Sequence, residues 1–352
     1  MRFDLEAAGG GALREVGEGE EGGWSDDLLV VGTVTDGQDS DGEKKPSGFL
    51  LVYRLVNGAS SLELLHRTNI GIGVRPVALL PFHGRVVVGA GQALRVYALG
   101  RKKLLRKCES RSAAPAGVVR LSSPGGRRIL VGDLQGSARV ILYYETQGVE
   151  GTEGTTGRMA LVSEEATPRW ISAIAPVDWD TIVGGDKFGD VFVTRMDRPW
   201  SGRVDTEPAT VVGTGAGRDR PLMSPMIQFH LGDAPVISVT KTPLVPGGRD
   251  VLVYATFSGL VGVLIPIGSK EDGAFLQALE VLIREARPAL CGRDVAAWRG
   301  AFTPAKGVID GEMCEAFGTL RPVERENMAE SLDRTVAQVA KRLEDLRALY
   351  AF

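Results

Sequence analysis

The segment Ile182-Val183-Gly184-Gly185-Asp186-Lys187-Phe188-Gly189-Asp190-Val191-Phe192-Val193 decides the fold class. An apolar run ends in two glycines, a short turn closes with Gly189, and a second apolar run begins at Val191. Glycine is favoured in such turns because it adopts positive φ angles at little cost. The segment therefore predicts a β-hairpin with a tight turn.

The same hairpin pattern recurs along the first three quarters of the chain. Five valines mark the copies and follow one another at intervals of 43 to 70 residues: Val31, Val88, Val131, Val183 and Val253. A four-stranded propeller blade takes roughly 40–50 residues. The longer intervals contain polar or glycine-rich stretches at 36–46, 147–157 and 199–221, which we interpret as surface loops.

These repeats predict a mainly β protein that contains a partial, WD-repeat-like β-propeller of about five recognisable blades. A β-sandwich or β-barrel with similar hairpins is the alternative, since a tryptophan–aspartate repeat signature is missing. Five blades fall short of a usual closed ring of about seven, so we expect the first blades to be missing. An open ring has unpaired edges, and the isolated chain is expected to aggregate or to melt early.

From Ser269 onward the apolar residues follow a helical period. Phe275, Leu279 and Ile283 lie on one face of a predicted helix, which Pro288 ends. The last helix is predicted to begin with a capping box at 335–338. We therefore predict a propeller domain over residues 1–268 and a small all-α domain over residues 269–352.

Composition excludes several classes of protein. The chain has 352 residues and a net charge of −3, so a strongly basic nucleic-acid binder is not expected. Three cysteines argue against a disulfide framework and against a zinc site. No apolar run approaches the roughly 18 residues that span a bilayer. We expect a soluble protein of a reducing, intracellular compartment.

The search for catalytic residues is mostly negative. Each of the three histidines, His66, His83 and His230, lies in or beside a predicted strand, which favours a structural role. Residues 184–189 are glycine-rich but lack the Gly-Lys-Ser/Thr sequence of a phosphate loop. Asp178 and Asp180 could act as an acid–base pair, although a turn between strands favours aspartate anyway. We predict that the protein is not an enzyme and binds no cofactor and no metal.

Two further features leave alternatives open. The basic run Arg101-Lys102-Lys103 with Arg106-Lys107 could contact RNA phosphate, but a solvated strand edge is the interpretation we favour. Trp170 and Trp298 fit interface anchors and core residues equally well.

Several long blocks resemble the splicing factor 3b subunit three family. The residues that carry the resemblance are 82–89, 94–109, Pro168-Arg169-Trp170, Asp178-Trp179-Asp180-Thr181, Asp186-Lys187-Phe188-Gly189, Cys291-Gly292-Arg293-Asp294, 308–311, 332–335, 343–347 and Tyr350-Ala351-Phe352. The C-terminal residues distinguish this family from two related ones, which share the fold but not this ending. These are the large subunit of the damaged-DNA-binding complex and the large polyadenylation-specificity subunit.

The resemblance implies three propellers followed by a helical domain, of which this chain corresponds to most of the third propeller and the helices. It also implies a non-catalytic nuclear scaffold of the U2 small nuclear ribonucleoprotein, a part of the spliceosome that recognises the branch site in precursor messenger RNA. The implied partners are the HEAT-repeat subunit and the small subunit of splicing factor 3b and other proteins of the U2 small nuclear ribonucleoprotein. Direct contact with RNA stays open and an indirect one is favoured, and neither a membrane nor a small-molecule substrate is expected. An adaptor of the damaged-DNA-binding type, which recruits substrates to a ubiquitin ligase or a chromatin complex, is the alternative.

The resemblance also implies which residues face these partners. They are Thr167, Pro168, Arg169, Trp170, Asp186, Lys187, Lys241, Pro246, Gly247, Gly248, Ser258, Gly259 and Lys306. Loops at one rim of a propeller converge, so we expect these residues to share one broad surface. Two departures stand out: Pro115 lies where the family has a contact asparagine, and the acidic insertion at 36–46 is unusual for the family.

Overall fold

A computed structural model describes residues 28–38, 44–56, 61–147, 155–206, 221–232, 234–287, 292, 294–300 and 305–351. The chain forms two compact units, one of residues 1–180 and 196–224, the other of residues 181–195 and 225–352. The predicted domain boundary between residues 268 and 269 stays a prediction. In the described part of the chain, no helix is long and apolar enough to cross a membrane.

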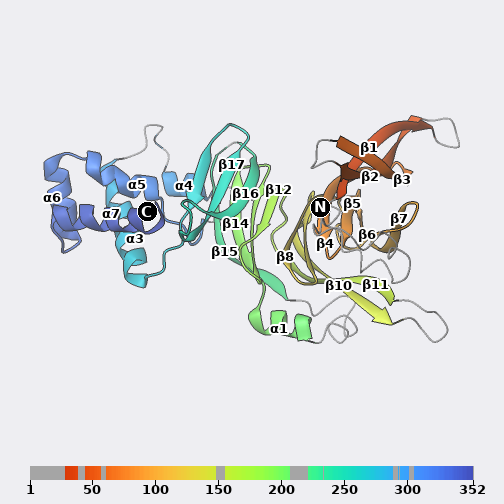
Figure 1. The fold of residues 1–352 in the computed structure, drawn as a ribbon. Helices are drawn as coiled ribbons and strands as arrows, with labels where there is room; N and C mark the ends of the chain where they lie inside the picture. The colour runs from red at the N-terminus through yellow and green to blue at the C-terminus, as the bar shows by residue number, and fades with distance from the viewer. Residues whose placement is uncertain are drawn as a thin grey trace, which may run out of the picture. The chain divides into compact units, whose positions relative to one another are not determined.

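The first unit is built from antiparallel sheets (Figure 1). A three-stranded sheet has the order β1-β2-β3, a four-stranded sheet the order β4-β5-β6-β7, and strands β8 to β11 pair in sequence. The strands are β1 Leu28–Gln38, β2 Lys44–Val56, β3 Ser61–Ile72, β4 Pro76–Phe82, β5 Arg85–Ala90, β6 Ala93–Leu99, β7 Leu104–Ser110, β8 Val118–Gly125, β9 Arg128–Asp133, β10 Ser137–Gln147, β11 Thr155–Glu165 and β12 Ile171–Pro176. Helix α1, Arg198–Thr206, also belongs to this unit.

The second unit combines strands and helices. Strands β13 and β14 form a hairpin, and β16, β17 and β18 form a three-stranded sheet. The elements of this unit are β13 Thr181–Asp186, β14 Asp190–Arg195, most of β15 Leu222–His230, β16 Val236–Pro243, β17 Asp250–Thr256, β18 Val261–Leu264, α3 Lys270–Ala286, α4 Val295–Arg299, α5 Gly311–Glu315, a 3-10 turn Ala316–Thr319, α6 Pro322–Ser331 and α7 Val336–Ala351. The mainly β, propeller-type fold with a small helical C-terminal part is thereby confirmed.

The repeated Val-Gly motif has a packing reason. In four places a strand glycine lies against the first residue of the next run of antiparallel strands: Gly32 against Pro76, Gly89 against Val118, Gly132 against Ile171 and Gly185 against Val236. A Cβ atom on Gly132 would lie 2.7 Å from Cγ2 of Ile171, closer than carbon atoms pack. The glycine therefore lets successive runs of strands approach closely at the same point of each repeat.

The middle strands of the sheets are buried on both faces. Strands β5, β6, β9, β13 and β14 are buried along almost their whole length. This explains why they read as continuous apolar runs rather than as alternating ones. Val88, Val131 and Val183 have no exposed surface, whereas Val31 retains 36%.

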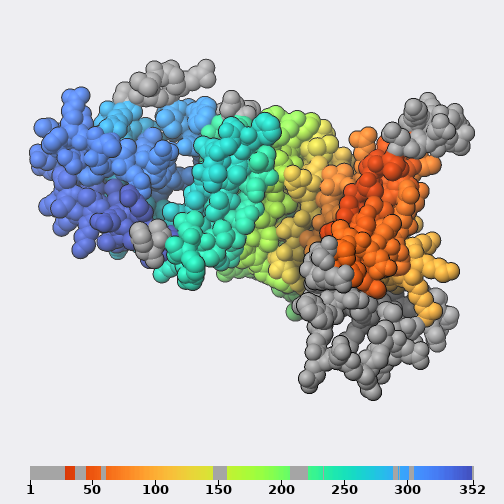
Figure 2. All heavy atoms as spheres, turned by 45° about the horizontal axis from the view of Figure 1, so that its top comes forward, coloured from red at the N-terminus to blue at the C-terminus, as the bar shows by residue number. Residues whose placement is uncertain are grey.

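Helices α3, α5, α6 and α7 and the 3-10 turn share a core of their own within the C-terminal helical part, drawn in blue in Figure 2. Ser269 caps α3, because its side chain accepts from the backbone of Glu271 and Asp272. The predicted capping box of α7 is also present, because Thr335 N donates to Gln338 Oε1 and Gln338 N donates to Thr335 Oγ1. Helix α3 ends at Ala286, just before the predicted breaker Pro288.

Two of the predicted surface loops are in part regular structure. Residues 36–38 and 44–46 extend the β1–β2 hairpin, with Asp36 opposite Pro46, while residues 39–43 lie outside the described part of the chain. The stretch 199–221 contains most of α1, whose residues Ser201 and Val204 are buried. Glycine and arginine content made this stretch look irregular, but packing stabilises the helix. Residues 148–154 and 207–220 lie outside the described part of the chain.

The β1–β3 sheet is apolar on both faces. One face contributes Val30 and Val52 to the core shared with β5. The opposite face carries Val31, Leu62 and Leu64, which retain 36%, 53% and 51% exposure. An apolar sheet face that stays in water promotes association.

Replacing Val31, Leu62 and Leu64 by threonine is expected to reduce aggregation of the chain, because threonine keeps β-propensity and removes apolar surface. Light scattering after size exclusion measures the fraction of aggregated protein, which should fall in the triple variant. The melting temperature of this variant should stay within a few degrees of that of the wild type. The control is Val30→Thr on the buried face, which is expected to cost about 1–3 kcal/mol of stability. Equal aggregation of the triple variant and the wild type would contradict the assignment of this face as the cause.

Candidate partner-binding surface

The segment Thr167–Trp170 connects β11 to β12 in the first unit. Arg169 is 2% exposed, and its Nε donates to Glu165 Oε1 at 2.7 Å. Its carbonyl accepts from Ser137 N at 3.3 Å, which fixes the segment beside the β9–β10 turn. Pro168 is exposed, and Thr167 and Trp170 are half-buried. Arg169 therefore holds the segment in place, and the neighbouring residues form its surface.

Asp186 and Lys187 occupy the β13–β14 turn in the second unit. The buried Asp186 carboxylate accepts from the backbone of Phe188 at 2.9 Å and of Asp190 at 3.0 Å. Such side-chain caps explain why aspartate ends this strand. Lys187 is exposed, with its Nζ 5.1 Å from the centroid of the Phe188 ring. The aspartate shapes the turn and the lysine is presented to solvent.

Residues 231–235 bring this turn together with the β17–β18 turn. Leu231 N donates to Gly189 O at 2.9 Å, and Phe257 N donates to Pro235 O at 2.8 Å. Ser258 and Gly259 follow in the second turn, where Gly259 has a φ of 90°. Asp186, Lys187, Ser258 and Gly259 therefore lie along one rim, which we call the turn rim.

The turn rim also contains Phe257, a residue that sequence reasoning missed. Its side chain is 78% exposed, and Leu260 beside it is 50% exposed. Phe257 holds the same turn position as Lys187 and Leu134, one residue after the polar cap of each hairpin. An aromatic residue at that position of the repeat was the available signal, because an exposed aromatic ring is typical of a binding surface.

Lys241, Pro246, Gly247 and Gly248 lie elsewhere. They belong to the β16–β17 hairpin near its turn, at the end of β17 opposite to Ser258. The seven residues of β17 separate the two turns by about 20 Å at roughly 3.4 Å per residue. Lys241 Nζ forms an ion pair with Asp250 at 3.2 Å. The expectation that all candidate residues share one rim is therefore wrong, because consecutive turns of a meander alternate between its two ends.

Lys306 ties the segment after α4 to strand β15. Its backbone pairs with Gln228 through hydrogen bonds of 3.1 and 2.8 Å. Its Nζ donates to Pro225 O at 2.7 Å. Lys306 is exposed, but its ammonium group is engaged within the second unit.

His230 is part of a buried polar cluster. Its Nδ1 lies 2.9 Å from Asp190 Oδ1, and its ring packs edge-on against Trp298 at 5.4 Å. Arg299 links His230 O to Asp310 Oδ2, at 3.3 and 2.8 Å. The cluster anchors α4 to the sheet strands, which is a structural role for His230. Trp298 retains 39% exposure, so it is neither fully core nor free surface.

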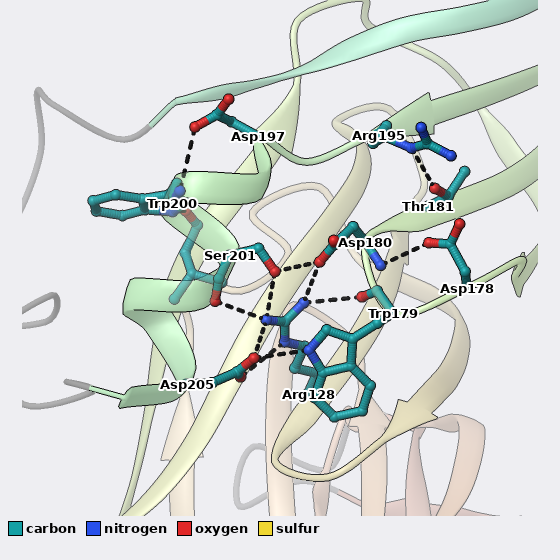
Figure 3. Close-up of polar contacts among 11 residues, drawn as sticks. Arg128, Asp178, Trp179, Asp180, Thr181, Arg195, Asp197, Trp200, Ser201 and Asp205 are labelled. Carbon is teal, nitrogen blue, oxygen red and sulfur yellow. Dashed lines mark hydrogen bonds and ion pairs between the residues drawn. The ribbon is translucent and has the colours of Figure 1, made fainter.

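Asp178 and Asp180, the candidate acid–base pair, belong to a structural network around Arg128. Figure 3 shows the guanidinium of Arg128 enclosed by Asp180, Ser201 and Asp205, with the Trp179 ring beside it. The side chain of Arg128 has no exposed surface. Asp178 caps the turn by accepting from Asp180 N at 2.9 Å.

Every N–H of the Arg128 guanidinium has an acceptor. Nε and Nη2 donate to the two oxygens of Asp205 at 3.2 and 2.6 Å, and Nη1 donates to Asp180 Oδ1 at 3.2 Å and to Trp179 O at 2.9 Å. Nη2 also reaches Ser201 Oγ at 2.7 Å. A buried charge is tolerated only when it is paired in this way. The carboxylates are thus committed to holding α1 and the β12–β13 turn on β9.

The cysteines of the described part show no activated thiol. Burial raises the pKa of Cys108 to about 11. Burial, together with the charge of Glu280, raises the pKa of Cys314 to about 12. Since the thiolate is the nucleophile, both groups are inert at neutral pH. Cys291 lies outside the described residues, and among the described ones no cluster of three or more histidine, cysteine or acidic side chains could hold a metal ion.

Comparisons with known proteins agree on one family. A family model described as the CPSF A subunit region matches residues 12–319. Splicing factor 3B subunit 3 of Danio rerio is 39% identical over 312 residues, covering 87% of this chain and 24% of that protein. Pre-mRNA-splicing factor RSE1 of Mycosarcoma maydis is 38% identical over 327 residues, covering 91% and 25%.

Spliceosome-associated protein 130 A of Arabidopsis thaliana is 37% identical over 329 residues, covering 91% of this chain and 26% of that protein. The chain thus spans about a quarter of the length of the curated relatives it matches.

Arg128→Ala is expected to destabilise the chain by about 3 kcal/mol, because it leaves Asp180 and Asp205 without their buried partner. The melting temperature measures the loss. Arg127→Ala is the matched control, since the neighbouring side chain is exposed and should contribute less than about 0.5 kcal/mol. Equal melting temperatures for the two variants would refute the structural role of Arg128.

Proposed function

Because the chain belongs to the family of the CPSF A subunit region, we propose that it is a non-catalytic scaffold subunit of the splicing factor 3b complex. The resemblance of its residues to that family is confirmed by relatives that are named as splicing factors. In this proposal the chain works in the nucleus within the U2 small nuclear ribonucleoprotein. It supports branch-site recognition through contacts with other proteins.

The observation that carries the proposal is the turn rim. It presents Lys187, Ser258 and the exposed ring of Phe257 from hairpins whose backbones are fixed by capped turns. A rigid surface loses little conformational entropy on binding, and an exposed aromatic ring supplies a large contact area. These properties suit a surface that holds a partner.

The proposed occupants are the HEAT-repeat subunit and the small subunit of splicing factor 3b. The candidate contacts on the turn rim are Asp186, Lys187, Ser258 and Gly259. Further candidate contacts in the first unit are Pro168 and its neighbours. In the second unit they are Lys306 and the β16–β17 hairpin with Lys241 and Pro246–Gly248. That hairpin turn lies at the opposite end of its sheet from the turn rim, so the two turns are separate candidate contacts.

The second candidate function is an adaptor of the damaged-DNA-binding type for a ubiquitin ligase or a chromatin complex. It uses the same kind of sheet surface but different partners. The first function is favoured by sequence identities of 39% and 37% with relatives that are named as a splicing factor and as a spliceosome-associated protein.

The combined substitution Lys187→Glu and Phe257→Asp is expected to weaken binding of the HEAT-repeat subunit. A pull-down from nuclear extract should recover at least about tenfold less of that subunit, because truncation of an interface anchor costs about 2 kcal/mol or more. The control combines Leu62→Asp with Lys270→Glu, since it makes the same change in net charge at two exposed positions away from the turn rim. Recovery of a cullin without the HEAT-repeat subunit by the wild-type chain would replace the splicing proposal by the adaptor.

A further inference from the structure

The β6–β7 turn and strand β7 carry a concentration of positive charge that the proposed scaffold role does not use. Residues 101–111 contain six basic residues and one acidic residue, a net charge of +5. The whole chain has a net charge of −3, so its other residues together carry −8. Such a concentration in an acidic chain is a local feature and not a consequence of composition.

The structure places these cations at the edge of a sheet. Strand β7 is the last strand of the sheet β4-β5-β6-β7 (Figure 1). Leu104 is buried, while residues 101–103 and 105–107 are exposed. The turn is closed by Gly100 N donating to Lys103 O at 3.1 Å, which fixes the backbone that carries Arg101, Lys102 and Lys103.

Neighbouring acidic groups do not neutralise this charge. Glu109 accepts from Arg95 at 2.9 Å, from Arg106 at 2.6 Å and from Arg111 at 3.1 Å, so its carboxylate is already surrounded by arginines. Arg101, Lys102, Lys103 and Lys107 form no ion pair with any described residue. We call these four residues the basic edge.

We propose that the basic edge binds the phosphodiester backbone of single-stranded RNA directly. Exposed lysines act as point charges for phosphates, and their binding energy comes from the release of counterions. Residues 101–111 contain no aromatic residue for base stacking, so the contacts are made to phosphates. Because phosphate contacts carry no sequence information, binding is independent of base sequence.

An acidic protein partner and a purely protective role for the charge both fit the geometry less well. Lysine is depleted from protein–protein interfaces, where arginine and aromatic residues supply the energy, so an acidic protein is the weaker candidate occupant. Protection of a strand edge against aggregation requires charge on the strand itself. Here three of the four cations lie on the turn, where no further strand can pair.

The proposal goes beyond the scaffold role and does not need the proposed protein partners. It is tested on the 352-residue chain alone, by fluorescence anisotropy with a labelled oligouridylate of about 20 nucleotides. The test variant carries Lys102→Glu, Lys103→Glu and Lys107→Glu. The control variant carries Arg198→Glu, Lys270→Glu and Lys341→Glu, three exposed positions that give the same change in net charge.

The wild type is expected to bind with a slope of log K against log salt of about −2.8, since each of four phosphate contacts contributes about −0.7. The test variant should lose at least about tenfold in affinity near 100 mM salt and fall to a slope of about −0.7. The control should retain the slope of the wild type. Lys102→Gln with Lys103→Gln, a milder change on the turn, should reduce the slope by about 1.4.

Three results would overturn the proposal: no binding by the wild type near 50 mM salt, equal weakening in the test and control variants, or stronger competition by polyglutamate than by unlabelled RNA. The last result would assign the basic edge to an acidic protein. Recovery of the HEAT-repeat subunit by the test variant should stay unchanged, which separates failure of this proposal from failure of the scaffold function.

Discussion

The close approach of a strand glycine to the first residue of the next run of antiparallel strands is the contact on which the described architecture depends. It occurs at Gly32, Gly89, Gly132 and Gly185, and in each case the partner is the first residue of a strand. Since a methyl group has no room there, the glycine sets the distance between consecutive runs of strands. The apolar residues before it then fill the space between them, as Val88 and Val131 do with no exposed surface.

This contact also explains how the surface is organised. In the hairpins that contain Gly132 and Gly185, and in the β17–β18 hairpin, a buried polar residue stands at the turn: Asp133, Asp186 and Thr256. Asp186 and Thr256 are buried caps, and the residues after them, Lys187 and Phe257, point into solvent. The buried polar residue thus has the same structural role in these hairpins, whereas the exposed residue after it differs from one hairpin to the next. That exposed residue is the one that a partner can contact.

Much of this could be predicted from the sequence. The hairpins follow from apolar runs and glycine turns, and the capping box at 335–338 follows from short-range residue chemistry, so both depend on neighbours in the chain. Helix α1 was missed because its stability comes from the burial of Ser201 and Val204 and from the contact with Arg128, which lies 73 residues before Ser201. No local pattern distinguishes Arg128 from the exposed Arg127 before it. The candidate partner residues lie at two ends of a sheet, and predicting this placement requires knowledge of how the strands pair. Composition does not contain that information.

The most direct test of glycine-mediated sheet packing is the melting temperature of Gly132→Val compared with that of Gly202→Ala. Gly132 in β9 packs against Ile171 in β12, while Gly202 lies in α1 with no atom within 4 Å of an added Cβ. Gly132→Val is predicted to cost about 1–3 kcal/mol through overpacking, and Gly202→Ala is predicted to be neutral or stabilising. If Gly132→Val melted at the wild-type temperature, the sheets would not be packed through their glycines and the repeated architecture described here would be contradicted.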